Sequence, residues 1–268
     1  MFMKKTISSP KPNAGIEVAF QKALDRMVED MHRSLMKWLS AAYRAKPPKL
    51  AQDSEYVGSS ATVMNRVMQR LSSRWLKRFD DAAPELARYF ATAAFARSDK
   101  DLQMILRKAG FSVKFQMSRV VQESLQANIH QNVSLIKSIA EQHLSEVEGM
   151  VMRSVTAGRD LHQLQEDLIK RYGITRRRAA LISRSQNNLA SANIQRVRQI
   201  ELGITEMMWV HSAAGREPRP SHVKAGKDKL TYDPKQGALI DGEYIFPGEK
   251  INCRCYSRMV LPDFKKKV

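Results

Sequence analysis

The sequence contains few cysteines, few aromatic residues and no long apolar run. Two of its 268 residues are cysteine, and 7% are aromatic. Cys253 and Cys255 stand one residue apart, so a disulfide between them would close too small a loop to stabilise a fold. A disulfide-stapled secreted domain is therefore excluded, and a surface that stacks single-stranded bases is disfavoured. Because no apolar stretch approaches the length that crosses a bilayer, we expect no membrane partner.

Acidic residues are scarce in comparison with basic ones. The chain has 45 Lys and Arg against 27 Asp and Glu, a formal net charge of +18. This excess is larger than solubility requires and favours a polyanionic partner. DNA, RNA or an acidic protein surface are the candidates, and attraction to a phosphate backbone without reading of the bases fits this composition better than stacking of single-stranded bases.

Most of the chain follows a helical period. Apolar residues recur every three or four positions over residues 16–44 and 120–155, with charges between them, which predicts amphipathic helices. A stretch near 46–58 contains two prolines and a glycine and has little periodicity, so it is predicted to be a linker.

Capping residues suggest where the helices begin and end. We expect helix starts at Pro84, at Ser98 and at Thr175, because proline suits a first turn and serine or threonine caps one. We expect helix ends at Gly110 and Gly203.

The pattern changes after about residue 205. The segments "TEMMWVHSA", "GEYIFPGEK" and "CYSRMVLP" are typical of strands, whereas "AGREPRPSHVKAGK" is typical of a polar loop. Earlier in the chain, "FSVKFQM" alternates apolar and polar residues and is also predicted to be extended.

These patterns predict a mainly α protein with a small α+β C-terminal module and an elongated helical N-terminal body. The predicted parts are a flexible N-terminal tail at residues 1–14 and a helical body at residues 15–204, with its linker near 46–58. A small module with an Asn-Cys-Arg-Cys motif is predicted at residues 205–262, and a basic tail at residues 263–268.

Four potential metal ligands fall within the predicted module: His211, His222, Cys253 and Cys255. Two imidazoles and two thiolates suit a tetrahedral zinc site, but zinc-binding cysteine pairs usually have two to four residues between them. The alternative is that these residues are buried and brace a loop-rich domain, with Asn252 supporting a turn. We favour the bracing role and expect no obligatory cofactor, with zinc as the metal that the set would bind.

Catalytic patterns are weak. A cysteine–histidine nucleophile needs an activating third group, and the paired carboxylates of many nucleases are missing from the loop over residues 211–222. We therefore expect no enzymatic activity.

Two runs of basic residues are candidates for anion binding. One lies in the first turn of the helix predicted from Thr175, where positive charge opposes the helix dipole, and the other is at the C-terminus. The two runs are Arg176, Arg177, Arg178 and Lys265, Lys266, Lys267. Along the same predicted helix, a cationic surface is expected to continue over Arg184, Arg196 and Arg198.

Several motifs in a fixed order resemble a known family. "RPSH" followed by Gly-Lys, then "PGE", then "NCRC" is similar to the phage head morphogenesis family, the Mu F-like minor head proteins, and the likeness runs from about residue 128 to 262. The motif residues are Arg219, Ser221, His222, Asn252, Cys253, Arg254 and Cys255. Family members often have a polar or acidic stretch before "RPSH", where this chain has Ala213 and Ala214, so an acidic ligand is not expected there.

The resemblance implies a minor capsid protein of a tailed double-stranded DNA phage. It would associate with the portal protein and the inner face of the major capsid protein, assist head assembly and DNA packaging or ejection, and touch DNA without sequence preference. It would be located in the virion, in the capsid interior near the portal vertex, after assembly in the host cytoplasm. Two alternatives stay open: a metal-dependent nuclease or hydrolase of the particle, and a DNA-binding assembly factor that is not retained in the virion.

Overall fold

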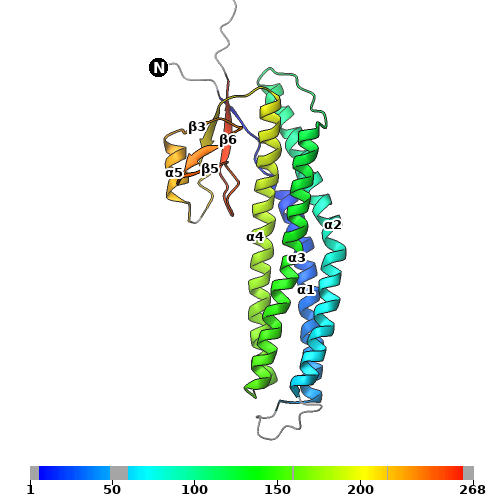
Figure 1. The fold of residues 1–268 in the computed structure, drawn as a ribbon. Helices are drawn as coiled ribbons and strands as arrows, with labels where there is room; N and C mark the ends of the chain where they lie inside the picture. Colours follow the sequence, from blue (N-terminus) through cyan, green and yellow to red (C-terminus); the bar gives the residue numbers. More distant parts are fainter. Residues whose placement is uncertain (1–5, 49–59, 159, 216, 262–268) are drawn as a thin grey trace, which may run out of the picture. The chain divides into compact units, whose positions relative to one another are not determined.

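A computed structural model describes residues 6–48, 60–158, 160–215 and 217–261 of the chain. The predicted fold class is confirmed: long helices dominate, and short antiparallel strands gather in the C-terminal region (Figure 1). The helices are α1 (Ala14–Ala45), α2 (Ser60–Lys108), α3 (Arg119–Thr156), α4 (Leu161–Glu201) and α5 (Pro220–Lys227). The strands are β1 (Thr6–Ser8), β2 (Met207–Val210), β3 (Thr231–Tyr232), β4 (Ala238–Ile240), β5 (Glu243–Ile245) and β6 (Tyr256–Val260).

The chain folds into two compact units that are not continuous in sequence. Unit 1 combines Met1–Val18, Arg88–Ile129 and Ser183–Val268, and unit 2 combines Ala19–Ala87 and His130–Ile182. The helices α1 to α4 each supply a segment to both units, so the units do not coincide with the helical body and module expected from the sequence.

Unit 2 is a set of helical segments that pack through a repeating apolar stripe. In α1 the fully buried side chains follow a spacing of three and four residues: Leu24, Val28, Met31, Leu35 and Leu39. Polar contacts join neighbouring helices at its margins. Tyr43 of α1 lies 2.7 Å from Ser154 of α3, and Lys137 of α3 pairs with Asp80 of α2 at 3.0 Å.

The expected helix starts at Pro84 and Ser98 are wrong, because α2 runs without interruption from Ser60 to Lys108. Pro84 is exposed, and so is Asp80, the residue whose backbone carbonyl loses its helical hydrogen bond to the proline. Buried residues before and after it keep the helical spacing, among them Phe79, Ala87 and Phe90. Packing of this continuous stripe therefore overrides the local preference of proline for a first turn.

The helix start expected at Thr175 is also wrong. Helix α4 begins at Leu161 and continues through Gly173, and Thr175 is buried in its interior. The hydroxyl of Thr175 donates to the carbonyl of Arg171, one turn earlier, instead of capping a new helix. The expected ends at Gly110 and Gly203 are confirmed, and both glycines adopt a positive φ just after a helix.

Unit 1 is built around a four-stranded antiparallel sheet in the order β1-β6-β2-β3, with β4 and β5 forming a separate hairpin. The three predicted C-terminal strands are confirmed in β2, β5 and β6. The prediction of a flexible tail over residues 1–14 is wrong for Thr6–Ser8, because β1 pairs with β6 and places Ile7 opposite Met259. Residues 111–117 form no strand in the structure, although they were expected to be extended from their alternation.

The sheet buries one apolar face together with the end of α2. Ile7, Met207 and Trp209 share a core cluster with Leu102 and Leu106 of α2. The polar loop predicted over "AGREPRPSHVKAGK" is wrong in its second half, which forms α5 with Pro220 in its first turn. His222 and Ala225 are the buried residues of α5.

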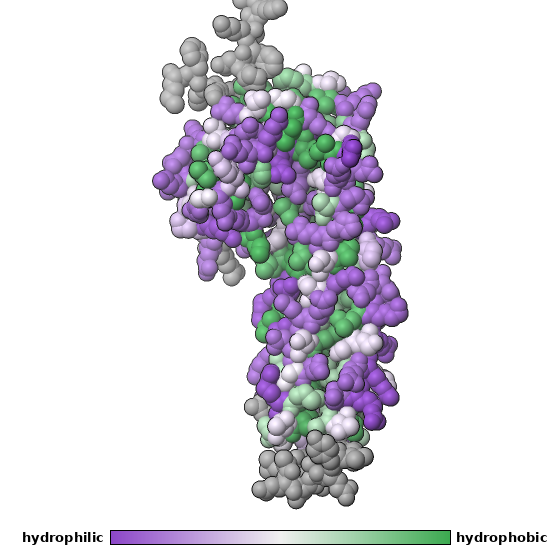
Figure 2. Space-filling model, viewed as in Figure 1, coloured by the Kyte–Doolittle hydropathy of each residue, from purple (hydrophilic) through white to green (hydrophobic). Residues whose placement is uncertain are grey.

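The visible surface is mainly hydrophilic, and hydrophobic side chains form small separate areas on the face drawn in Figure 2. Of the helices within the described residues, none combines the length and the apolar character that crossing a membrane needs.

Candidate metal centre in the C-terminal module

The four predicted ligands come together in unit 1. His211 directly follows β2, His222 lies on α5, and the two cysteines precede β6. The Sγ atom of Cys253 lies 3.5 Å from Nδ1 of His222, and Sγ of Cys255 lies 3.8 Å from the same nitrogen. Nδ1 of His211 is 3.6 Å from Sγ of Cys255. His222, Cys253 and Cys255 are buried and offer ligand atoms that all lie within 4.8 Å of one another.

The "FPGE" segment forms a tight turn beneath the cysteines. The N–H of Glu249 donates to the carbonyl of Phe246 at 3.2 Å, with Pro247 and Gly248 between them. Gly248 has a φ of +88°, which suits the third position of a type II turn and explains proline before it. The carboxylate of Glu249 closes the turn by accepting from the N–H of Phe246 at 2.7 Å.

A second turn delivers Cys253. Its N–H donates to the carbonyl of Lys250 at 2.9 Å, and Asn252 adopts a φ of +60°, a conformation that asparagine tolerates better than most residues. The expected turn role of Asn252 is therefore borne out by its backbone. The side chain of Asn188 on α4 donates to the carbonyl of Cys253 at 2.8 Å, so the helix fixes the position of the motif.

The two arginines of the motifs hold the loops around the cluster. The Nη2 group of Arg219 donates to the carbonyl of Ile251 at 3.2 Å, and the Nη1 group of Arg254 donates to the carbonyl of Ala214 at 2.7 Å. Each arginine thus belongs to one loop and binds the backbone of the other. Their role is positioning, which their sequence context alone did not reveal.

Glycine allows α5 to approach the cluster closely. A Cβ atom at Gly226 would lie 2.7 Å from Cβ of His211 and 2.9 Å from its backbone nitrogen. Trp209 completes the packing, with its ring 5.0 Å from that of His222 in an edge-to-face arrangement. Sequence reasoning did not assign a site role to Gly226 or Trp209, although glycine within a short helix indicates a close backbone approach.

The environment of the two thiols favours one thiolate. The Cys255 thiol donates a hydrogen bond to Cys253, and this bond is the main cause that lowers the pKa of Cys253 to about 5. Burial opposes the shift, whereas the N–H groups of Cys255 and Gly248 and the side chain of His222 add to it. The same bond, burial and the charge of Cys253 raise the pKa of Cys255. The arrangement therefore favours ionisation of Cys253 over ionisation of Cys255.

A hollow of about 850 Å³ opens beside the cluster. Its lining includes His211, Arg184, Glu217, Arg219 and Arg254. Arginine side chains thus surround an entrance to the cysteines and histidines.

The predicted anion-binding arginines are placed differently from the expectation. Because α4 begins at Leu161, Arg176, Arg177 and Arg178 lie in the helix interior, and the dipole argument for them is wrong. Arg176 pairs with Asp25 at 3.3 Å, and Arg178 donates to Ser138 at 3.0 Å. The three terminal lysines, Lys265, Lys266 and Lys267, lie outside the described residues.

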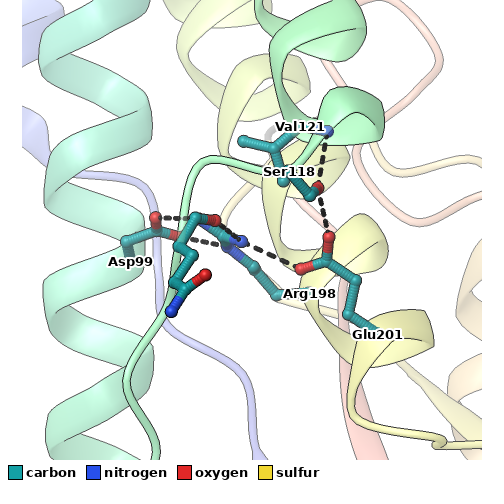
Figure 3. A network of polar contacts seen from close by, with 6 residues as sticks. Asp99, Ser118, Val121, Arg198 and Glu201 are labelled. Carbon is teal, nitrogen blue, oxygen red and sulfur yellow. Dashed lines mark hydrogen bonds and ion pairs between the residues drawn. The ribbon is translucent and has the colours of Figure 1, made fainter.

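The prediction that Arg198 belongs to a cationic surface is wrong, because Arg198 is buried in an ion-pair network (Figure 3). Its Nη2 and Nε groups donate to both carboxylate oxygens of Asp99 at 2.7 and 2.9 Å, and Nη1 donates to Glu201 at 2.9 Å. Burial opposes the charged form of Arg198, but these hydrogen bonds raise its pKa overall. Ser118 donates to the second oxygen of Glu201 and accepts from the N–H of Val121, so it caps α3.

An exposed row of arginines on α2 was missed by sequence reasoning. Arg66, Arg70 and Arg74 recur every four residues, are exposed, and form no ion pair with another described residue. Over residues 60–78 the chain has five Lys and Arg and no Asp or Glu. The four-residue spacing was visible in the sequence and places the side chains along one face of a helix.

Comparison with known proteins identifies the segment that contains the site. Residues 145–258 match the family described as "Phage Mu protein F like protein". An uncharacterized protein of Haemophilus influenzae is 33% identical over 144 residues, which cover 53% of this chain and 30% of that relative. The chain therefore spans less than a third of that relative's length. No solved structure matches the chain.

The matched residues include α4, α5 and both cysteines, and they agree with the motif order from which the resemblance was inferred. Over residues 145–258, the chain is therefore similar to the phage Mu F-like family.

Proposed function

We propose that this protein is a phage head morphogenesis protein, a minor capsid component that docks on the portal protein and on the inner surface of the major capsid protein. It would enter the virion during assembly in the host cytoplasm and occupy the capsid interior near the portal vertex. The observation that carries the proposal is the family match over residues 145–258, which includes the whole Cys/His cluster. Its proposed work is docking, without a catalytic step.

The contacts of the module support a docking role. The reciprocal bonds of Arg219 and Arg254, together with that of Asn188, fasten two loops and a helix to one another within unit 1. Such a fastened module presents its surface with little conformational freedom, which lowers the entropy lost when a partner binds.

The portal contact is testable by co-sedimentation of the purified chain with the portal protein of the same phage. We expect the association to persist after nuclease treatment and at about 1 M salt, where the Debye length is about 3 Å and contacts bridged by DNA dissolve. Association that is lost under these conditions would instead indicate a DNA-binding assembly factor that is not held by the portal.

The arginine row on α2 supports the proposed contact with DNA. One guanidinium every four residues corresponds to a rise of about 6 Å along the helix. These groups have no carboxylate partner among the described residues and so keep their charge available for phosphates. We therefore place the non-specific DNA contact on Arg66, Arg70 and Arg74 in addition to the basic runs expected from the sequence.

Two charge-matched triple variants test this assignment. Replacing Arg66, Arg70 and Arg74 by Gln should reduce the slope of log affinity against log salt by about 2 to 3, because each phosphate contact contributes about 0.9. The same change at Arg176, Arg177 and Arg178 should have a smaller effect, since Asp25 and Ser138 already engage two of these arginines. A larger effect of the second triple would reverse the assignment.

A metal-dependent hydrolase is the second candidate, favoured by the hollow that opens beside the cluster and is lined by arginines. Incubation of the purified chain with double-stranded DNA, with and without chelator, separates the two. Cleavage that disappears with chelator and in His222→Ala would establish this alternative. Intact DNA in both conditions would support the docking role.

A further inference from the structure

We propose that Cys253, Cys255, His222 and His211 bind one zinc ion in a tetrahedral structural site. The argument rests first on the distances between ligand atoms. With Zn–S bonds of about 2.3 Å and Zn–N bonds of about 2.0 to 2.1 Å, a tetrahedral site has nitrogen-to-sulfur edges of about 3.6 Å. Of the four nitrogen-to-sulfur pairs in the cluster, the two of His222 and that of His211 with Cys255 lie at 3.5, 3.8 and 3.6 Å.

The single residue between the cysteines does not prevent both sulfurs from reaching one ion. In an extended segment, alternate side chains point to the same side. Cys253 and Cys255 are buried, whereas Arg254 between them is exposed and binds the carbonyl of Ala214. The Cys-Arg-Cys spacing therefore directs both thiols inward, which removes the objection raised by the usual spacing of zinc-binding pairs.

Backbone donors around the sulfurs fit metal-bound thiolates. The N–H groups of Gly248 and Cys255 donate to Sγ of Cys253, and the N–H of Ser212 donates to Sγ of Cys255. Such outer hydrogen bonds orient ligands and are a regular part of metal sites. The turn that contains Gly248 therefore supplies one of these outer hydrogen bonds as well as the chain reversal.

His211 is the ligand that closes the site. Its Nδ1 atom is near Cys255 but lies outside the group of three whose ligand atoms are mutually close. His211 borders the hollow, and its role as fourth ligand requires its side chain to rotate toward the ion while the backbone that packs against Gly226 stays in place. Without this fourth protein ligand, the ion would keep an open position toward the hollow, as catalytic zinc sites do.

Cobalt titration of the full-length chain under reducing conditions tests the site without any variant. Bound Co²⁺ should give the visible bands of tetrahedral coordination and a thiolate-to-cobalt charge-transfer band, and one equivalent of Zn²⁺ should abolish both. Elemental analysis of the purified protein should find one zinc per chain. A folded protein that gives neither the spectrum nor stoichiometric metal would overturn the proposal.

Histidine variants test which side chains are ligands. His222→Ala should lose stoichiometric metal, and His211→Ala should bind it more weakly and change the cobalt bands. His130→Ala, at an exposed histidine of unit 2, is the matched control and should bind as the unmodified protein does. Unchanged binding and spectrum in His211→Ala would overturn the closed four-ligand site and leave an open one with three protein ligands.

Discussion

At the scale of single residues, the module depends on positions where only one side-chain size fits. Gly226 is the clearest case, because its neighbour is the backbone of His211 and cannot swing away. Gly215, in the loop between β2 and α5, has no atom within 4 Å of the Cβ it would gain. The two glycines therefore offer a matched pair.

Gly226→Ala should destabilise unit 1 by about 1 to 3 kcal/mol, the usual cost of overpacking, even though alanine favours helices by about 1 kcal/mol over glycine. Gly215→Ala should leave the free energy of unfolding nearly unchanged. Urea denaturation of both variants beside the unmodified protein measures the difference. Equal stability of the two variants would mean that α5 does not press on His211.

A buried histidine should make unit 2 sensitive to acid. Nδ1 of His143 lies 2.8 Å from the hydroxyl of Thr175, which itself donates to Arg171, so the imidazole is the donor in this bond. Burial, followed by the charges of Arg171 and His32, lowers the pKa of His143 from 6.5 to about 4.

Because the folded state holds His143 neutral, its contribution to stability is complete above pH 6.5 and is lost as the pH falls toward 4. The shift corresponds to about 3 kcal/mol, since one pKa unit is about 1.4 kcal/mol. His143→Gln should flatten the fall in unfolding free energy between pH 6.5 and 4, whereas His130→Gln at an exposed position should not. An unchanged pH profile in His143→Gln would contradict this account.

At the scale of elements, the Arg198 network joins α2, α4 and the segment before α3. Arg198 binds Asp99 of α2, Glu201 of its own helix and the carbonyl of Gln116. Its side chain is 3% exposed, while its two carboxylate partners are 24% and 31% exposed. Removal of the arginine would therefore leave two partly buried carboxylates without their shared partner.

Arg198→Met should destabilise unit 1 by about 3 to 5 kcal/mol, the cost of breaking a buried ion pair from one side. Arg119→Met is the control, because the pair of Arg119 with Glu123 is exposed and should contribute at most about 1 kcal/mol. Unfolding free energies from urea titrations measure both effects. Similar values for the two variants would show that the network is not important for stability.

Elements also show how far the sequence predicts this fold. The strand pattern of "TEMMWVHSA" and the helix ends at Gly110 and Gly203 were readable, because alternation and positive-φ glycines act locally. The helix starts predicted at Pro84 and Thr175 were wrong, because the apolar stripes of α2 and α4 continue past these residues and packing outweighs capping preference. The four Cys/His residues were found from composition, whereas the bonds of Arg219 and Arg254 depend on loops that meet only in the folded chain.

At the scale of the whole molecule, the two units divide the proposed work. Unit 1 holds the Cys/His cluster, and unit 2 holds the arginine row of α2. A substitution that disrupts the Cys/His cluster should therefore leave the arginine row intact, and the reverse should also hold. The segments of the chain that form each unit are known, so peptide-level measurements can report on them separately.

Hydrogen exchange with and without chelator tests whether the proposed zinc stabilises unit 1 and leaves unit 2 unaffected. If zinc stabilises the module, its removal should destabilise the folded module, because the free energy of metal binding contributes to the free energy of folding. Amide exchange should then rise over β2, α5 and β6. Exchange in the unit 2 segments of α1 and α3 should stay the same. Addition of one equivalent of zinc should restore protection, which excludes a direct effect of the chelator. Equal exchange with and without chelator would show that the hydrogen bonds of Arg219, Arg254 and Asn188 hold the module without a metal.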